Sequence, residues 1–383
     1  MINIVILLYR DCYFLSEFGP AVRDLQFLFE LEKNPAVSKI TIINRPVSIV
    51  EMLCGRKIKK RIIKSDKITT LDSISYDLLG PLKGRSWSEY IYNDVLQKKI
   101  TELYDDNCIN VLLDFLPIGR FSVDLKNKWF YWYDLIDNFT KHNRFSDSEK
   151  SLVRKKYDFV KKNADIVTGV SIKALDEFPS DIVKKVIPNR IYGYISDDRN
   201  NNSFLSPNIP IFDFGFVGFI TDKFDFSILE ELGKKYTIAI YGKCFDRKIK
   251  DKIISLKNVH YFGQFKYAQL QNIIPTFKVG LLPYILQKSH DESPLKIYEY
   301  LKYNRPCLTS IDYEVNSKYI INYNDGSYVK YIEKILDMYK NENITSAITK
   351  DMYLYTALDG FLNNNILNRV RSHNENFNNS SSL

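Results

Sequence analysis

The stretch around Ser293 and Lys296 contains residue types that could hold a phosphate group. Ser293 is a favourable N-cap, and Pro294 suits the first helical position, where an N–H would have no partner. Lys296 would then be the third helical residue, with its ammonium group at the positive end of the helix dipole. That placement is favourable only if an anion binds there as well. The sequence therefore predicts a phosphate site built from the backbone of Ser293–Leu295 and the side chain of Lys296.

Two carboxylates flank this stretch, Asp291 before the predicted cap and Glu299 one turn into the helix. Carboxylate oxygens accept hydrogen bonds, so these side chains suit the hydroxyls of a sugar attached to the phosphate. The alternative is a solvated i,i+3 pair between Lys296 and Glu299, which would contribute roughly 0.2–0.5 kcal/mol.

Glycines at strand ends favour the phosphate site over the surface pair. Apolar runs at 212–219, 236–243 and 259–263 are typical of buried strands, and they carry Gly218, Gly242 and Gly263 near their ends. Glycine allows a backbone to approach a ligand closely. Three such glycines in one sheet, ahead of an anion-binding helix, predict a nucleotide or phosphate site.

The first half of the chain shows the same alternation of strands and helices. Residues 2–8 and 39–43 read as strands and residues 21–33 as the helix between them, which is typical of a parallel α/β sheet. A later aromatic strand, 129–133, is followed by Asp134 and Asp137. Ligand groups collect beyond the carboxyl ends of such strands, so both are candidates for a general base. The alternative is that they are turn or cap carboxylates.

Composition indicates a two-domain globular protein. The chain has 383 residues, 45% of them hydrophobic, and a net charge of +8. Part of the positive charge lies in a basic block at residues 55–64, which is either a membrane-surface contact or a solvated loop. No nucleic-acid module accompanies it, so nucleic acid is not an expected partner.

Cysteine and histidine usage indicates a cytoplasmic protein with neither disulfides nor a metal site. The five cysteines include no CxxC pair, and the four histidines show no ligand spacing. The N-terminal apolar run lacks the basic leader of a signal peptide, and no run is long enough to span a bilayer.

Several segments resemble the donor-binding half of GT-B glycosyltransferases, with the bacterial teichuronic-acid and xanthan enzymes as the nearest type. The resembling segments are 215–218, 258–264, 279–284 and 293–301, and a looser likeness covers 128–190. The resemblance implies an α/β fold with two Rossmann-like domains facing a cleft, and a C-terminal helix that crosses back to the first domain. We expect an acceptor-side domain at 1–190, a linker at 191–210, a nucleotide-sugar domain at 211–357, a helix at 358–374 and a disordered tail at 375–383.

The resemblance also implies residue roles. Asp291 and Glu299 have the spacing of the family's E-x7-E pair, with Asp in the first place. Glu299 should bind the ribose hydroxyls, and Asp291 should act next to the donor sugar. Lys243 is preferred to Lys223 and Arg247 as a further cation on the diphosphate. The family's Glu-Gly-Phe-Gly run is absent from this chain.

The resemblance implies a glycosyltransferase that moves a sugar from a nucleotide-sugar, with UDP-sugar expected, to a bacterial surface glycan on a lipid-linked acceptor. N–H groups and a lysine would stabilise the nucleoside diphosphate leaving group without a metal or other cofactor. Asp137 would be the base if the reaction inverts configuration. The expected location is cytoplasmic, with peripheral membrane contact through 55–64.

Two other functions remain open at this point. A nucleotide-sugar epimerase or hydrolase on the same fold would need no acceptor. A non-catalytic protein would bind the nucleotide or the glycan without transferring a sugar.

Overall fold

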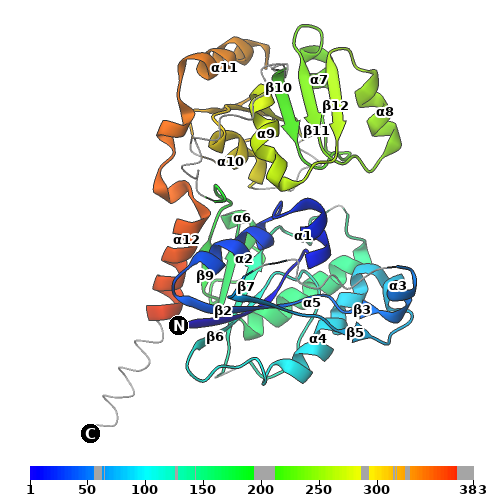
Figure 1. Ribbon diagram of the computed structural model, residues 1–383, viewed down its shortest axis with the longest axis vertical. Helices are drawn as coiled ribbons and strands as arrows, with labels where there is room; N and C mark the ends of the chain where they lie inside the picture. Colours follow the sequence, from blue (N-terminus) through cyan, green and yellow to red (C-terminus); the bar gives the residue numbers. More distant parts are fainter. Residues whose placement is uncertain are drawn as a thin grey trace. The chain divides into compact units, whose positions relative to one another are not determined.

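The protein is described by a computed structural model that covers residues 1–55, 63, 65–125, 128–142, 144–193, 212–285, 293–313, 315, 317–323 and 328–368. The chain forms two compact α/β units (Figure 1). The first comprises Met1–Pro188 and the chain from Tyr355 onward, and the second comprises Asn189–Leu354. Most of the basic block, most of the predicted linker, Asp291, the end of the predicted C-terminal helix and the predicted tail lie outside the described residues.

The first unit is built on a seven-stranded parallel sheet with the order β4-β2-β1-β6-β7-β8-β9. Its strands are β1 (Ile2–Leu7), β2 (Val37–Ile43), β4 (Ile68–Leu71), β6 (Ile109–Asp114), β7 (Phe130–Leu135), β8 (Ile166–Gly169) and β9 (Lys184–Val186). Every residue of β1 is buried, which explains its continuous apolar sequence, because strands covered on both faces need no polar alternation.

Helices cover both faces of this sheet. One face packs against α4 (Ser88–Lys99) and α5 (Asp147–Asn163), and the other packs against α2 (Arg23–Lys33). The shorter elements are α1 (Cys12–Phe18), α3 (Ile49–Leu53), α6 (Ile172–Leu175), the 3-10 helix at Gly80–Trp87, and a two-stranded pair of β3 (Val47–Ser48) and β5 (Ile74–Ser75).

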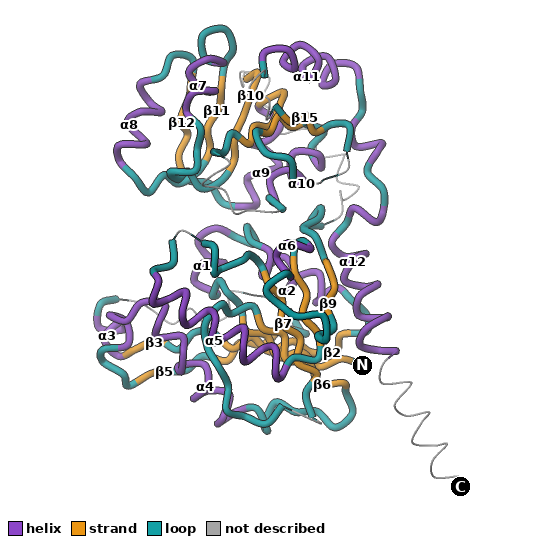
Figure 2. The backbone as a smooth tube through the Cα atoms, turned by 180° about the vertical axis from the view of Figure 1, so that it is seen from behind, coloured by secondary structure: helices purple, strands orange, loops and turns teal. Residues whose placement is uncertain are grey.

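The C-terminal helix packs on the first unit, as predicted. Helix α12 (Leu354–Phe361) continues into a π-helical segment (Leu362–Leu367), and it begins four residues earlier than the sequence indicated (Figure 2). The ring of Phe361 lies 4.4 Å from that of Trp132 in β7, and Asn34 donates to Asp359 at 2.9 Å. The C-terminal segment therefore packs against the α2 and β7 regions of the first unit.

The second unit contains a six-stranded parallel sheet with the order β12-β11-β10-β13-β14-β15. Its strands are β10 (Phe212–Val217), β11 (Ile238–Tyr241), β12 (Val259–Gly263), β13 (Phe277–Leu282), β14 (Cys307–Thr309) and β15 (Ile320–Asn322). Its helices are α7 (Phe226–Leu232), α8 (Arg247–Ser255), α9 (Leu270–Ile273), α10 (Leu295–Lys302) and α11 (Val329–Asn341), with short 3-10 turns between them.

Both sheets reverse their strand order beside their first strand. The reversal lies between β1 and β6 in the first unit and between β10 and β13 in the second. Open α/β sheets bind ligands beyond the carboxyl ends of the strands at such a point. Among the described residues, no helix is both long and apolar enough to cross a bilayer.

Candidate functional site

The three predicted glycines lie side by side at the carboxyl edge of the second sheet. The N–H of Gly218 donates to the carbonyl of Tyr241 at 2.9 Å, and that of Gly242 donates to the carbonyl of Gly263 at 2.7 Å. All three have a positive φ, of 135°, 152° and 79° in chain order. A side chain would strain the backbone at each of these positions, so each requires glycine. The three glycines therefore form one row at the carboxyl ends of neighbouring strands, as the sequence predicted.

Two of these glycines are explained by contacts within the protein. A Cβ at Gly242 would lie 1.7 Å from the carbonyl oxygen of Gly218, and a Cβ at Gly218 would lie 2.2 Å from Cε of Lys296. A Cβ at Gly263 would meet no atom within 4 Å. Gly218 and Gly242 therefore make room for neighbouring backbone and for Lys296.

Helix α10 begins one residue later than predicted, with Pro294 as its N-cap. Ser293 does not cap the helix. Its hydroxyl instead accepts the backbone N–H of Asn189 at 3.2 Å, and its carbonyl accepts the side-chain amide of Asn189. The predicted cap is wrong because the Ser293 hydroxyl is hydrogen-bonded to Asn189, 104 residues away in the sequence.

The ammonium group of Lys296 lies at the reversal point of the second sheet. Lys296 is the second residue of α10, not the third. Its Nζ is 5.6 Å from the ring centroid of Phe216 in β10 and 5.5 Å from that of Tyr284, which follows β13. These contacts hold the cation beside Gly218, where a ligand of an open α/β sheet would lie.

Glu299 is a buried carboxylate, so the surface-pair interpretation is wrong. It accepts a hydrogen bond from the hydroxyl of Tyr267, and burial raises its pKa above the ordinary value. Burial and the Glu299 charge together raise the pKa of Tyr267, so this hydroxyl stays a donor. Oε2 of Glu299 is shielded from solvent and has no hydrogen-bond partner among the described residues. A buried acceptor without a donor is costly, and a ligand hydroxyl would satisfy it.

The three cations considered for the diphosphate differ in burial. The side chain of Arg247 is 94% exposed, and the exposed Lys243 places Nζ 5.2 Å from the ring of Phe245. Lys223 is buried, and its carbonyl accepts the N–H of Ile285 at 2.8 Å, so it lies where the chain leaves β13. Burial is the property that the sequence did not reveal.

The two candidate bases, Asp134 and Asp137, have different surroundings in the first unit. Asp134 is buried and forms a bidentate pair with Arg23, with both oxygens 2.8 Å from guanidinium nitrogens, and it also accepts from Thr168 at 2.6 Å. It is therefore a structural carboxylate. Asp137 lies two residues beyond the end of β7 and is partly exposed.

Comparison with solved structures identifies the fold of the chain. No protein-family model and no curated protein matches the chain. Among solved structures, AviGT4, a glycosyltransferase involved in avilamycin A biosynthesis, aligns with a TM-score of 0.51 and 10% identity, over 95% of this chain and 96% of AviGT4. The chain has the GT-B fold.

Two further solved structures align less well. An α,α-trehalose-phosphate synthase from Burkholderia vietnamiensis has a TM-score of 0.49 and 10% identity, over 99% of this chain and all of that one. TarM has a TM-score of 0.47 and 15% identity, and the match covers 70% of this chain and 56% of TarM, so this chain matches about half of TarM.

In this GT-B fold, the described carboxyl edges of the two sheets carry different side chains. The second unit presents Lys296, the three glycines and the buried Glu299, and the first presents Asp137. No group of three His, Cys, Asp or Glu side chains suited to a metal ion occurs among the described residues.

Proposed function

We propose that the protein is a glycosyltransferase that uses a nucleotide-sugar donor, with UDP-sugar expected, and needs no metal ion. The GT-B fold supports this proposal, and the position of Lys296 carries it. The cation lies next to the first N–H groups of α10, which have no acceptor within their own helix. Together they form a positive site at the reversal point of the sheet, suited to a diphosphate.

The mechanism follows from where negative charge develops. When the bond between sugar and phosphate breaks, charge accumulates on the leaving nucleoside diphosphate. Lys296 and the helix N–H groups are already oriented, so they can stabilise this charge without reorganising. Glu299 would accept the ribose hydroxyls through Oε2. Lys223 is a second cation that we favour over Lys243, because it is buried at the same strand ends.

Asp137 is the proposed base in an inverting reaction. Its carboxylate lies beyond β7, and Asp134 is already engaged by Arg23. A base must remove the proton of the attacking acceptor hydroxyl as the sugar is transferred. Asp291, the other predicted catalytic residue, lies outside the described residues.

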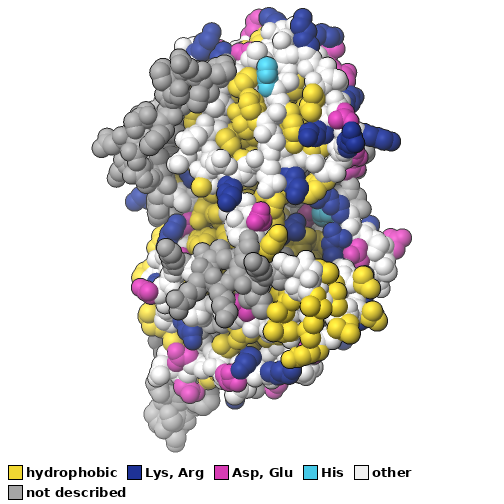
Figure 3. Space-filling model, turned by 45° about the vertical axis from the view of Figure 1, so that its right-hand side comes forward, with side chains coloured by type: hydrophobic (Ala, Val, Ile, Leu, Met, Phe, Trp, Pro, Cys, Tyr) yellow, Lys and Arg dark blue, Asp and Glu magenta, His cyan; other side chains and the backbone are white. Residues whose placement is uncertain are grey.

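The proposed acceptor is a lipid-linked bacterial surface glycan, reached by peripheral contact with the inner membrane face. Large apolar side chains are exposed between Met52 and Leu82, among them Leu53 at 83%, Tyr76 at 80% and Leu82 at 83%. Hydrophobic side chains gather on part of the surface of the first unit in Figure 3. The basic block at 55–64 falls in the same stretch of sequence, and apolar and basic residues together suit an anionic bilayer.

Thermal unfolding with UDP-, GDP-, ADP- and CMP-sugars tests the donor site. One nucleotide should raise the melting temperature by several degrees, and Lys296→Met should weaken its binding at least tenfold. Lys334→Met removes a charge from the exposed face of α11 and should change nothing. If no nucleotide stabilises the protein, the proposal is wrong. Epimer formation from the donor alone would indicate an epimerase, and binding without transfer to any acceptor would indicate a binding protein.

A further inference from the structure

A pocket of about 490 Å³ lies within the first unit, where its strand order reverses. Its walls include Tyr9 and Arg10, which follow β1, and residues 116–118, which follow β6. This is the position at which open α/β sheets bind ligands, and the volume is in the range of small-molecule sites. None of the roles assigned above uses these residues.

Aromatic side chains form much of the pocket wall. They are Tyr9, Tyr13, Phe14, Phe18, Trp87 and Tyr92. Two carboxylates also line the pocket, but both already accept hydrogen bonds from the protein. Asp11 accepts the N–H of Phe14 at 3.0 Å, and Glu51 accepts from Arg45 at 2.6 Å.

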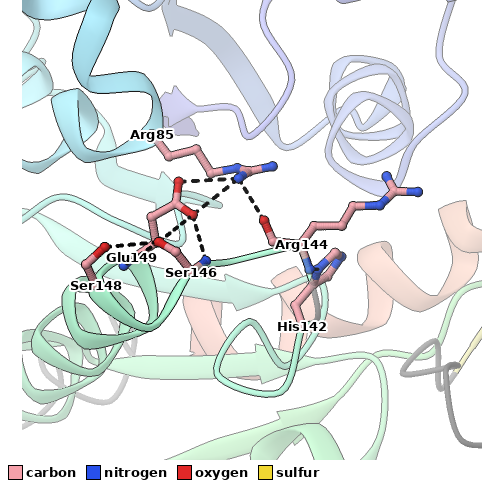
Figure 4. Close-up of polar contacts among 6 residues, drawn as sticks. All are labelled: Arg85, His142, Arg144, Ser146, Ser148 and Glu149. Atoms are coloured by element: carbon pink, nitrogen blue, oxygen red, sulfur yellow. Dashed lines mark hydrogen bonds and ion pairs between the residues drawn. The ribbon is translucent and has the colours of Figure 1, made fainter. Parts of the chain in front are cut away.

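Three arginines complete the wall, and two of them are fixed by contacts with the protein. Arg45 uses one terminal nitrogen for Glu51, and Arg85 uses one for the carbonyl of Arg144, at 3.0 Å, and for Glu149, at 3.3 Å (Figure 4). Figure 4 shows Arg85 lying against the start of α5, where Ser146 and Glu149 form the helix cap. A guanidinium group has five N–H donors, so each arginine retains donors for a ligand.

Of the three pocket arginines, Arg10 is the one whose guanidinium has no polar partner among the described residues. Its guanidinium lies 4.7 Å from the ring centroid of Tyr9 and 5.0 Å from that of Phe14. Within the described residues, the guanidinium group forms neither a hydrogen bond nor an ion pair, and its Nε is shielded from solvent. The backbone N–H of Arg10 donates to the buried carboxylate of Asp24 at 2.7 Å. A guanidinium group keeps its charge at any physiological pH, and its planar fork matches the two oxygens of a carboxylate or phosphate.

We infer that this pocket binds the acceptor through an anionic group, a phosphate or carboxylate carried by a sugar, held by Arg10 between aromatic walls. The inference rests on the proposed glycosyltransferase function, because only that function supplies a second, sugar-containing substrate. Arg45 and Arg85 also line the pocket and keep N–H donors for a ligand beyond those used for Glu51 and Glu149, while the two carboxylates of the lining accept hydrogen bonds from the protein. The hydroxyls of an uncharged sugar could accept hydrogen bonds from Arg10, but they carry no negative charge and would form weaker hydrogen bonds than a phosphate or carboxylate.

Calorimetric titration of the full-length protein with glucose 6-phosphate, glucuronate and glucose tests the inference. At least one anionic sugar should bind ten or more times as tightly as glucose, and added salt should reduce that preference. The comparison of phosphate with carboxylate identifies the anion. Arg10→Gln should abolish the preference, and Arg10→Lys should retain part of it, because it keeps the charge but loses the fork.

Arg154→Gln is the matched control, because it removes an exposed charge from α5 outside the pocket. It should leave all three affinities unchanged. The inference is overturned if glucose binds as tightly as both anionic sugars, or if folded Arg10→Gln or Arg10→Lys keeps the full preference. It is also overturned if UDP displaces glucose 6-phosphate, since the pocket would then be a donor site. Loss of UDP stabilisation alone would count against the proposed function instead.

Discussion

Asp24 is fully buried in α2, next to Arg10, one of the three arginines that line the first-unit pocket. One of its oxygens accepts the backbone N–H of Arg10 at 2.7 Å, and the other has no partner among the described residues. Burial raises its pKa from the ordinary 3.8 to about 6. Between these values the folded protein binds more protons than the unfolded chain. The Asp24 contribution to stability is therefore full below the unfolded pKa and is lost as pH rises through about 6.

Asp24→Asn should stabilise the protein at pH 7.5 and have little effect at pH 4, because the amide resembles the protonated acid. The gain should be on the order of 1–3 kcal/mol in the free energy of unfolding, measured by urea denaturation at both pH values. Asp158→Asn, at a position with 66% exposed side chain, is the control and should show no such difference. Equal destabilisation at both pH values would show that the carboxylate is needed for packing.

At the scale of elements, Gly218 and α10 position the proposed diphosphate site together. The space that a Cβ at Gly218 would fill holds the end of the Lys296 side chain, and Lys296 lies in the first turn of α10. The loop after β10 and the helix start therefore constrain each other. Asn189 restrains the segment before this helix through both the hydroxyl and the carbonyl of Ser293.

Gly218→Ala should weaken nucleotide binding at least fivefold, because the new methyl group would displace the Lys296 side chain. It should also reduce stability by about 1–3 kcal/mol, because φ is 135° there. Gly55→Ala is the matched control, with φ of 89° and no atom within 4 Å of its Cβ, so strain alone should appear. Unchanged nucleotide affinity in Gly218→Ala would contradict the assigned position of Lys296.

At the scale of the whole molecule, the chain leaves the first unit at Pro188 and returns to it at Tyr355. The returning helix contributes buried residues to the face of the sheet that holds Trp132, including Leu358, Phe361 and Leu362. The core of the first unit therefore depends on residues more than 300 positions from its first strand.

Phe361→Ala should destabilise the first unit by about 3 kcal/mol, because it opens a cavity beside Trp132. Tryptophan fluorescence during urea denaturation would report the loss. Asn363→Ala, at an exposed position of the same C-terminal segment, should change stability by less than about 0.5 kcal/mol. Equal stability of the two variants would mean that the helix does not pack on this unit in solution.

The local pattern of apolar and polar residues was sufficient to predict the α/β architecture. Runs such as 2–8 and 212–219 are short and predominantly apolar, which is typical of buried strands in a parallel sheet. Gly218, Gly242 and Gly263 stand at strand ends where φ is positive. Those properties depend on neighbours along the chain. The sequence therefore predicted the repeated strand–helix units, the glycine edge and the lysine at the start of α10.

Tertiary contacts decided what each polar group is available to do. Ser293 is held by Asn189, Asp134 by Arg23 and Glu299 by Tyr267, and these partners lie 104, 111 and 32 residues away. The burial of Lys223 and the place of Arg10 in the wall of a pocket likewise arise only when distant strand ends meet. Burial and hydrogen bonding depend on neighbours in space. Residue types and spacing could therefore identify these groups as candidates, but they could not predict their partners.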